Sequence, residues 1–117
     1  MAEIFAIHKK RKFTLQEARK LLPIVIRLTE QAEREVSRLN TQYQISEAGN
    51  KQGFADQIQK VFQEWYQKVH GLGAEVKGMW LVDFDEGEGY YCWHFPETEL
   101  CHYHGYKDGF EGRTKIH

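Results

Sequence analysis

A heptad stripe of apolar residues in the first half of the chain constrains the fold more than any other feature. The run Thr14-Leu15-Gln16-Glu17 fits a capping box, in which the side chains of Thr14 and Glu17 each accept a hydrogen bond from the other residue's amide, so we expect a helix to begin here. Apolar side chains then recur every three or four residues for about four heptads, the spacing of helices that pack side by side. The stripe consists of Leu15, Ala18, Leu22, Val25, Ala32, Val36, Leu39 and Tyr43, with Thr29 as its polar member.

Pro23 lies inside this stripe without changing its phase. Proline removes a helical hydrogen bond and clashes with the carbonyl of Arg19, which predicts a kink between these two residues. The alternative is a short helix that ends before Pro23 and a second helix that begins there. Gly49–Gly53 predicts a loop. The helix that follows carries apolar residues at helical spacing from Phe54 and is expected to end at His70–Gly73, so the pattern predicts an antiparallel helical hairpin.

The period of the apolar pattern changes to two after the hairpin. Three short strands are predicted, at Met79–Phe84, Tyr90–Phe95 and Glu99–His104. The prediction is therefore an α+β fold in a single domain over residues 1–117. Its parts are a long helical hairpin at 14–72, a three-stranded antiparallel β-meander at 79–104, and an irregular tail at 105–117 held by Tyr106 and Phe110.

The polar residues of this predicted meander define the candidate catalytic site. If the residues that flank each turn pair with one another, Asp83 lies opposite Tyr91, and Tyr91 lies opposite His104, with Cβ atoms about 4.5–5.5 Å apart. A carboxylate, a phenol and an imidazole in one row can orient a general base or bind a small polar ligand. The structural alternative is that Asp83 caps the turn while His104 bonds to a strand edge. A slip of one residue in the register would scatter the row.

Other residues of the same region extend the candidate site. Trp93 lies beside His102 in the next row, and Arg113 is expected to fold back from the tail as an anion clamp, so Trp93 and Arg113 are the candidate ligand-binding residues. His102 and His104 point to one face, a spacing that suits two metal ligands with Asp83 as the third. Because His-x-His occurs by chance and no group that would orient the imidazoles is evident, we assign no metal and no cofactor.

Both faces of the predicted sheet are apolar. One carries Met79, Leu81, Trp93, Phe95 and Leu100, and the other carries Trp80, Val82, Phe84, Cys92 and Tyr103. A meander that is wet on one side alternates apolar with polar residues, so here both faces need cover. The hairpin covers one face, and the tail or a second subunit must cover the other. The helical seam after Thr29 also outreaches strands of about six residues. These two surfaces predict a symmetric homodimer.

The overall composition argues against several classes of protein. The chain has 16 basic and 17 acidic residues, whereas nucleic-acid-binding domains carry a basic excess. No stretch approaches the roughly 18 apolar residues of a membrane span, and Met1–His8 lacks the pattern of a secretory signal. Cys92 and Cys101 are therefore expected to be reduced and packed as small apolar groups, in a cytoplasmic protein.

Two blocks of the sequence resemble a known family. One is Phe13-Thr14-Leu15-Gln16-Glu17-Ala18 followed by Leu21-Leu22-Pro23. The other runs through Gly73-Ala74-Glu75-Val76-Lys77, Leu81-Val82-Asp83-Phe84, Tyr91-Cys92-Trp93, Glu97, Glu99, His104 and Gly109-Phe110-Glu111-Gly112-Arg113. Their order is similar to that of the uncharacterised bacterial family catalogued as domain of unknown function 2203. The family pattern has an arginine where this chain has His94, and a Trp-His pair followed by an acid where it has Tyr103-His104-Gly105. The resemblance implies a small bacterial cytosolic protein and supplies no activity.

Two functions remain as hypotheses. The first is a non-catalytic module that binds a ligand or a protein of unknown identity and acts as a homodimer. It is favoured because no nucleophile–base pair or ligand set has a specific signature. The second is a small enzyme, metal-assisted in one version, that uses Asp83, Tyr91 and His104.

Overall fold

The computed structural model describes residues 11–116, so the expectation for Met1–His8 falls outside the described residues. Within 11–116 the elements are α2 (Leu15–Ile45), α3 (Ala48–Gly71), β1 (Glu75–Gly78), β2 (Leu81–Asp85), β3 (Gly89–His94), β4 (His102–Gly105), the 3-10 helix η1 (Phe110–Gly112) and β5 (Thr114–Lys115). The α+β class and the helical hairpin are confirmed. The three-stranded prediction is wrong, because over these residues the strands form a five-stranded antiparallel sheet in the order β1-β2-β3-β4-β5.

Helix α2 begins and continues as its sequence predicts. Thr14 Oγ1 accepts from the Glu17 amide at 3.1 Å, and Glu17 Oε1 accepts from the Thr14 amide at 2.9 Å, which completes the capping box. The helix runs through Pro23 without ending, so the alternative of two separate helices is excluded. Thr29, the polar member of the stripe, is fully buried. Its hydroxyl donates to the Val25 carbonyl at 2.7 Å and accepts from Trp65 Nε1 at 2.8 Å, which satisfies both groups.

The connection between the helices lies earlier than predicted. Only Ser46 and Glu47 separate α2 from α3, and the predicted loop Gly49–Gly53 forms the first turns of α3. Each glycine in a helix costs about 1 kcal/mol, a penalty that packing against a neighbouring helix outweighs. Lys51 then ties the two helices together, since its Nζ donates to the Tyr43 carbonyl at 2.6 Å. The predicted end of α3 is confirmed, and Gly73 takes a left-handed φ of 93° just beyond it.

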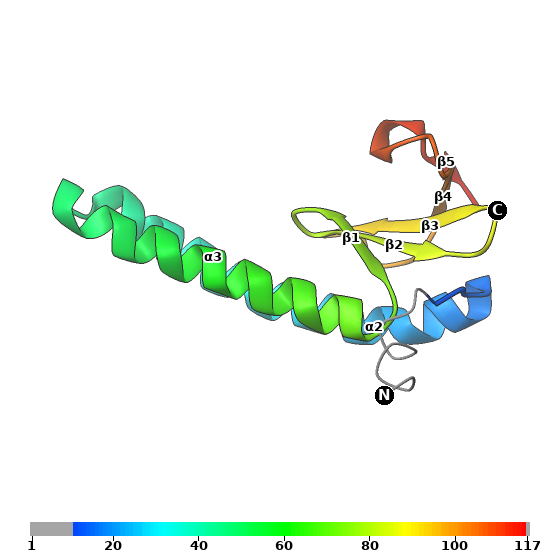
Figure 1. Cartoon of the computed structure of the whole chain (residues 1–117), viewed down its shortest axis with the longest axis horizontal. Coiled ribbons are helices and arrows are strands. Elements are labelled where there is room, and N and C mark those ends of the chain that lie inside the picture. The colour runs from blue at the N-terminus through cyan, green and yellow to red at the C-terminus, as the bar shows by residue number, and fades with distance from the viewer. Residues whose placement is uncertain (1–10, 117) are drawn as a thin grey trace, which may run out of the picture.

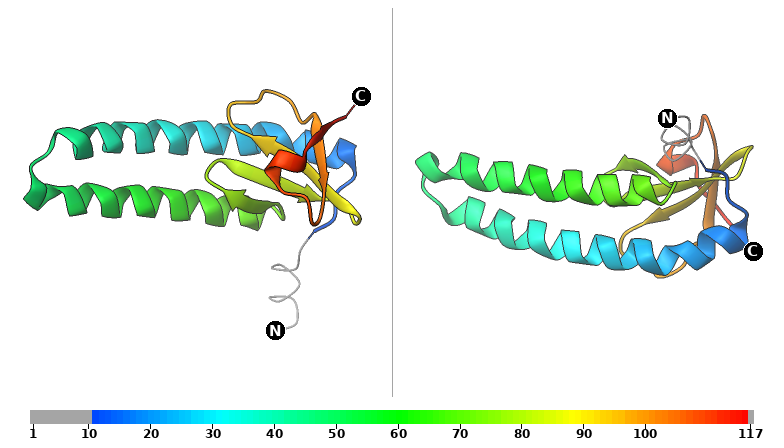
Figure 2. Two further views of the ribbon diagram at one scale, coloured as in Figure 1. Left: turned by 90° about the horizontal axis from the view of Figure 1, so that it is seen from above. Right: turned by 60° about the horizontal axis from the view of Figure 1, so that its bottom comes forward.

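The helices, the sheet and the C-terminal segment form successive layers. Figure 1 shows α2 and α3 on one side of the sheet and the segment with η1 and β5 on the other. Figure 2 shows that the hairpin runs well past the sheet, so only its base lies against the strands. The core between helices and sheet includes Ala18, Leu22, Val25, Trp65, Val69, Val82, Phe84 and Trp93. No helix in residues 11–116 is both long and apolar enough to cross a membrane.

The strand register differs from the predicted one at both turns. Asp83 pairs with Cys92 and Phe84 with Tyr91, while Tyr90 pairs with His104. The predicted row of Asp83, Tyr91 and His104 is therefore wrong. The turn after β2 is one residue tighter than assumed, with the Glu86 amide donating to the Gly89 carbonyl at 2.9 Å. Relative to the prediction, the β2–β3 pairing and the β3–β4 pairing are each shifted by one residue, in opposite directions. Asp83 and His104 therefore still share a face of the sheet, and Tyr91 moves to the other face.

This register also corrects the prediction that both sheet faces are apolar. The inner face, towards the helices, carries Val82, Phe84, Tyr91 and Trp93. The outer face carries mostly polar side chains, namely Glu75, Asp83, Asp85, Tyr90, Cys92, His102 and His104. The C-terminal segment lies over this face, where Tyr106 packs edge-on against Tyr90 and Phe110 packs at a tilt against His94, each with ring centroids 5.1 Å apart. The outer face of the sheet is therefore covered without a second subunit, and the overhang of the hairpin is the remaining basis for predicting one.

Candidate functional site

The outer face of the sheet and the C-terminal segment enclose a cavity of about 330 Å³. The sheet lines it with Lys77, Leu81, Asp83, Tyr90 and His104, and the C-terminal segment lines it with Tyr106–Phe110. We call this space the outer cleft. Tyr106 anchors the segment, because its hydroxyl donates to Asp85 Oδ1 at 2.7 Å. The volume lies at the lower end of the roughly 300–1,000 Å³ typical of small-molecule sites.

A buried carboxylate–imidazole pair forms one wall of the outer cleft. His104 Nε2 lies 2.9 Å from Asp83 Oδ2, and the two side chains are 5% and 1% exposed. His104 Nδ1 lies 2.8 Å from the Gly105 carbonyl oxygen, which can only accept, so Nδ1 carries a proton. The Nε2–Oδ2 contact then needs a second proton, held by either residue. Burial raises the pKa of Asp83, and the neighbouring Cys92 and His104 side chains oppose this rise. The pair is therefore a buried proton carrier.

Cys92 completes a compact cluster with this pair. Its position opposite Asp83 on β3 brings one potential ligand atom each of Asp83, Cys92 and His104 to within 4.8 Å of one another, and all three residues are buried. Burial raises the pKa of the Cys92 thiol, and the neighbouring Asp83 raises it further, so the metal-free side chain is a neutral thiol at physiological pH. Sequence reasoning missed Cys92, because the assumed register placed it on the opposite face from Asp83.

The structure places Tyr90 opposite His104, where the sequence predicts Tyr91. Tyr91 faces the helices and packs against Tyr103 with ring centroids 5.8 Å apart, so it takes no part in the cluster. Tyr90 lies opposite His104 instead, with ring centroids 5.3 Å apart. Its hydroxyl accepts from Lys77 Nζ at 3.3 Å and donates to Glu75 Oε1 at 3.4 Å. The candidate phenol of the site is thus Tyr90.

Trp93 and Arg113, the candidate ligand-binding residues, do not line the outer cleft. Trp93 is fully buried in the core, where its Nε1 donates to the Glu97 carbonyl at 2.8 Å. Arg113 does fold back onto the sheet, but its guanidinium binds the protein's own Glu97 through contacts of 3.0 Å to each carboxylate oxygen. His102 joins this group, since its Nδ1 lies 3.6 Å from Glu97 Oε2. The structure therefore places Asp83 and His104 with Cys92 rather than with His102.

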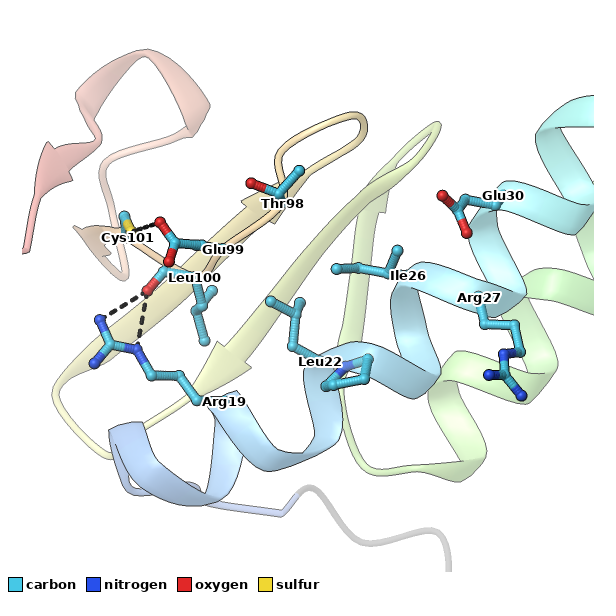
Figure 3. Close-up of a pocket in the computed structure, with 10 residues that line it drawn as sticks. Arg19, Leu22, Ile26, Arg27, Glu30, Thr98, Glu99, Leu100 and Cys101 are labelled. Atoms are coloured by element: carbon cyan, nitrogen blue, oxygen red, sulfur yellow. Dashed lines mark hydrogen bonds between the residues drawn. The ribbon is translucent and has the colours of Figure 1, made fainter.

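A second cavity, of about 640 Å³, lies between α2 and the segment that leads into β4. Figure 3 shows Leu22 and Ile26 rising from α2 towards Leu100, and the Arg19 guanidinium directed at the Leu100 carbonyl. Arg19 Nε and NH2 donate to that oxygen at 3.3 and 3.1 Å. Its lining combines apolar side chains with Arg27, Glu30 and the Cys101 thiol, which donates to Glu99 Oε2 at 4.0 Å. The outer cleft is the better candidate site, because two members of the buried titratable cluster, Asp83 and His104, line it.

The fold and the site define an α+β protein with a helical hairpin on one face of an antiparallel sheet and a buried Asp–Cys–His cluster on the other. The model of the family described as an uncharacterized conserved protein, domain of unknown function 2203, matches residues 11–116. The chain therefore belongs to this family. No curated protein and no solved structure matches the chain.

Proposed function

We propose that this protein is a non-catalytic binding module of the cytoplasm, and that its ligand is a small polar molecule held in the outer cleft. The observation that carries the proposal is the convergence of a buried Asp83–His104 pair with Lys77 and Tyr90 on one wall of a cavity of about 330 Å³. The opposite wall comes from a different segment of the chain, the tail at Tyr106–Phe110. A few convergent polar groups with aromatic walls are typical of small-molecule sites.

The charges of the cleft favour a ligand of low net charge. Lys77 Nζ lies 3.2 Å from Glu75 Oε1, so its charge is already compensated. Asp83 and His104 hold a proton between them and compensate each other. The cleft therefore offers hydrogen-bond donors and acceptors but little net charge. Such a site selects ligands by their pattern of hydrogen-bonding groups rather than by their charge.

Binding without catalysis is the better-supported version, because the cluster lacks an activated nucleophile. Burial holds the Cys92 thiol in its neutral form. The second candidate function is a small enzyme in which Asp83 and His104 transfer a proton to or from a molecule in the cleft. Its support is that both residues line the cavity. Turnover of a molecule found to bind in the cleft would decide between the two versions.

A fragment screen by ¹H–¹⁵N NMR tests the cleft. We expect binding fragments to shift the amide signals of Gly105, Lys107 and Gly109 around the cleft. The variant Phe110→Ala removes part of the wall and should weaken this binding by about tenfold or more. Tyr66→Ala is the matched control, because Tyr66 on α3 is 40% exposed, as Phe110 is, and lies outside the cleft. Fragments that shift only signals around Ile26 and Cys101 would contradict the proposal.

The same proposal includes a homodimer formed through the hairpin. Among residues 11–116, each helix beyond the sheet is covered only by the other helix (Figure 2). Val36, Phe54 and Ile58 of the hairpin remain partly exposed. Ile45 near the tip is 80% exposed. A second hairpin packed alongside would bury this surface. Analytical ultracentrifugation should show a dimer at concentrations of tens of micromolar, and a monomer throughout that range would contradict this part of the proposal.

A further inference from the structure

We propose that Asp83, Cys92 and His104 bind one divalent transition-metal ion of the zinc type, and that a free coordination position of this ion faces the outer cleft. The inference deepens the proposed function, since a ligand in the cleft would then complete the coordination of the ion. Metal binding itself rests only on the cluster. Its support comes from the geometry, from an unpaired oxygen atom, and from the chemistry of the donor atoms.

The spacing of the cluster is close to that of a tetrahedral site. Metal–ligand distances of about 2.0–2.3 Å place the ligand atoms of such a site roughly 3.3–3.6 Å apart. In the structure the donor atoms of Asp83, Cys92 and His104 lie within 4.8 Å of one another, and His104 Nε2 lies 2.9 Å from Asp83 Oδ2. Shifts of about an ångström or less would therefore bring the side chains onto a common ion. Strands β2, β3 and β4 each supply one ligand, so the backbone is already in place.

The imidazole of His104 is held in the orientation that a metal ligand requires. Its Nδ1 donates to the Gly105 carbonyl at 2.8 Å, which leaves Nε2 as the atom that faces Asp83 and Cys92. Metal-binding histidines commonly donate their other ring nitrogen to a carbonyl or carboxylate, because this fixes the ring and its tautomer. The contact to Gly105 provides the orienting group that the sequence did not reveal.

Asp83 Oδ1 is the independent observation that points to a ligand. Asp83 is 1% exposed, and among residues 11–116 its Oδ1 has no hydrogen-bond partner. A buried carboxylate oxygen without a partner has lost its hydration without compensation, so such atoms are rare in folded proteins. A cation beside Cys92 and His104 would satisfy this oxygen.

The donor set selects the class of metal and balances its charge. Binding releases the thiol proton of Cys92 and the proton held between Asp83 and His104, which leaves a thiolate, a carboxylate and a neutral imidazole. Their total charge of −2 matches a divalent ion. Sulfur and nitrogen donors favour Zn²⁺ over Mg²⁺ or Ca²⁺, which prefer oxygen ligands alone. The Arg113 guanidinium, which interacts with Cys92, lies where it would stabilise the thiolate further.

The site is of the open type. Three protein ligands leave a tetrahedral ion one position for water or an exogenous molecule, whereas purely structural zinc sites use four protein ligands. Asp83 and His104 both line the outer cleft, so we expect the remaining position to face this cavity. A small molecule with an oxygen, nitrogen or sulfur donor atom would bind there directly to the ion.

Titration of the chelator-treated full chain with Co²⁺ tests the inference, since a cobalt–thiolate bond absorbs in the near ultraviolet. We expect one Co²⁺ per chain and a near-ultraviolet band that Zn²⁺ abolishes by displacement. Cys101→Ser should retain the band, because Cys92 is then the chain's remaining thiol, and Cys92→Ser should lose it. Absence of the band from the wild-type chain, or its loss in Cys101→Ser, would overturn the inference. Both decisive readouts survive if Cys92→Ser fails to fold.

The histidines supply a second matched pair. His104→Gln should lower the affinity for Zn²⁺ by more than the roughly 10–100-fold seen when a group that merely orients a ligand is removed. His102→Gln, on the same sheet face, should change it by no more than a few-fold. Equal losses in the two variants would overturn the assignment of His104. Testing the fragments on the metal-free protein separates the two proposals. A protein that binds the metal but no fragment in the cleft defeats the proposed function alone. A protein that binds fragments in the cleft but does not bind the metal defeats this inference alone.

Discussion

The inner face of the sheet is covered by two long helices, whereas the outer face is covered by a short C-terminal segment, and the two faces bury opposite kinds of side chain. Val82, Phe84 and Trp93 on the inner face are fully buried in an apolar core. Asp83 and Cys92 on the outer face are as deeply buried, yet Tyr106 and Phe110 above them remain 48% and 40% exposed. The buried side chains of the inner face therefore form the apolar core, whereas those of the outer face form a titratable cluster under a thin cover.

The largest expected effect is the difference in stability loss between two phenylalanine substitutions, one on the inner side of the sheet and one on the outer side. Phe84→Ala should lower the free energy of unfolding by about 3–5 kcal/mol, because it leaves a cavity in the core beside Phe13. Phe110→Ala should lower it by about 1 kcal/mol or less, since Phe110 is half-exposed. Urea unfolding of both variants measures the difference. Similar losses would mean that the C-terminal segment contributes to the fold as much as the helical core does.

The next prediction breaks the polar pair on the outer face. His104→Leu leaves Asp83 Oδ2 without its partner and should lower the free energy of unfolding of the metal-free protein by about 1–3 kcal/mol. Replacing both residues in Asp83→Val/His104→Leu should recover most of this loss, because the buried carboxylate is then gone and the Gly105 carbonyl still accepts from the Asp108 amide. A double variant whose loss equals the sum of the two single losses would show that the residues do not interact.

A smaller effect should appear in the pH dependence of stability. The folded-state pKa of the Cys92 thiol is raised above its unfolded value by burial, so the unfolded chain loses this proton first as the pH rises. The free energy of unfolding of the metal-free protein should therefore fall above about pH 8.5, by about 1 kcal/mol per pH unit. The difference between wild type and Cys92→Ala isolates this contribution. Cys101→Ser should retain the wild-type dependence, and a Cys92→Ala variant that retains it too would contradict the buried thiol.

The smallest expected effect concerns the cover of the cleft. Tyr106→Phe removes the hydrogen bond of 2.7 Å to Asp85 Oδ1 and should loosen the C-terminal segment without changing the core. We expect faster hydrogen exchange at the amides of Asp108 and Gly112, which bond within this segment, and unchanged exchange in β2 and β3. Unchanged exchange at both amides would show that Tyr106 does not hold the cover in place.

The helical half of the fold was predictable because its signals are local. The capping box at Thr14 and the 3.6-residue period of α2 act within a few residues, and both appear in the structure. Even there the loop was misplaced, because Gly49 and Gly53 lie in the first turns of α3 despite the low helix propensity of glycine. The strands at the sheet edges were missed for a related reason: β1 mixes charged residues with glycine, and β5 has two residues, so neither shows an apolar alternation.

The site was only half predictable, because it depends on the register. The sequence singled out Asp83 and His104, and the structure brings these two side chains together, because two shifts of one residue in opposite senses kept them on one face. The same shifts exchanged Tyr91 for Tyr90 and brought Cys92 beside Asp83. The register between β2 and β3 is set by the geometry of the turn after Asp85, where Gly87 takes a φ of 109°. Because that turn contains two glycines, the sequence alone is compatible with either strand pairing.

The most direct test of the account is a measurement of this register by interstrand nuclear Overhauser effects in the isotope-labelled protein. We predict backbone contacts between Asp83 and Cys92 and between Tyr90 and His104, which bring the carboxylate, thiol and imidazole together. Contacts between Asp83 and Tyr91 and between Tyr91 and His104 would contradict it, because Cys92 would then leave the cluster and the metal site would lose its sulfur ligand.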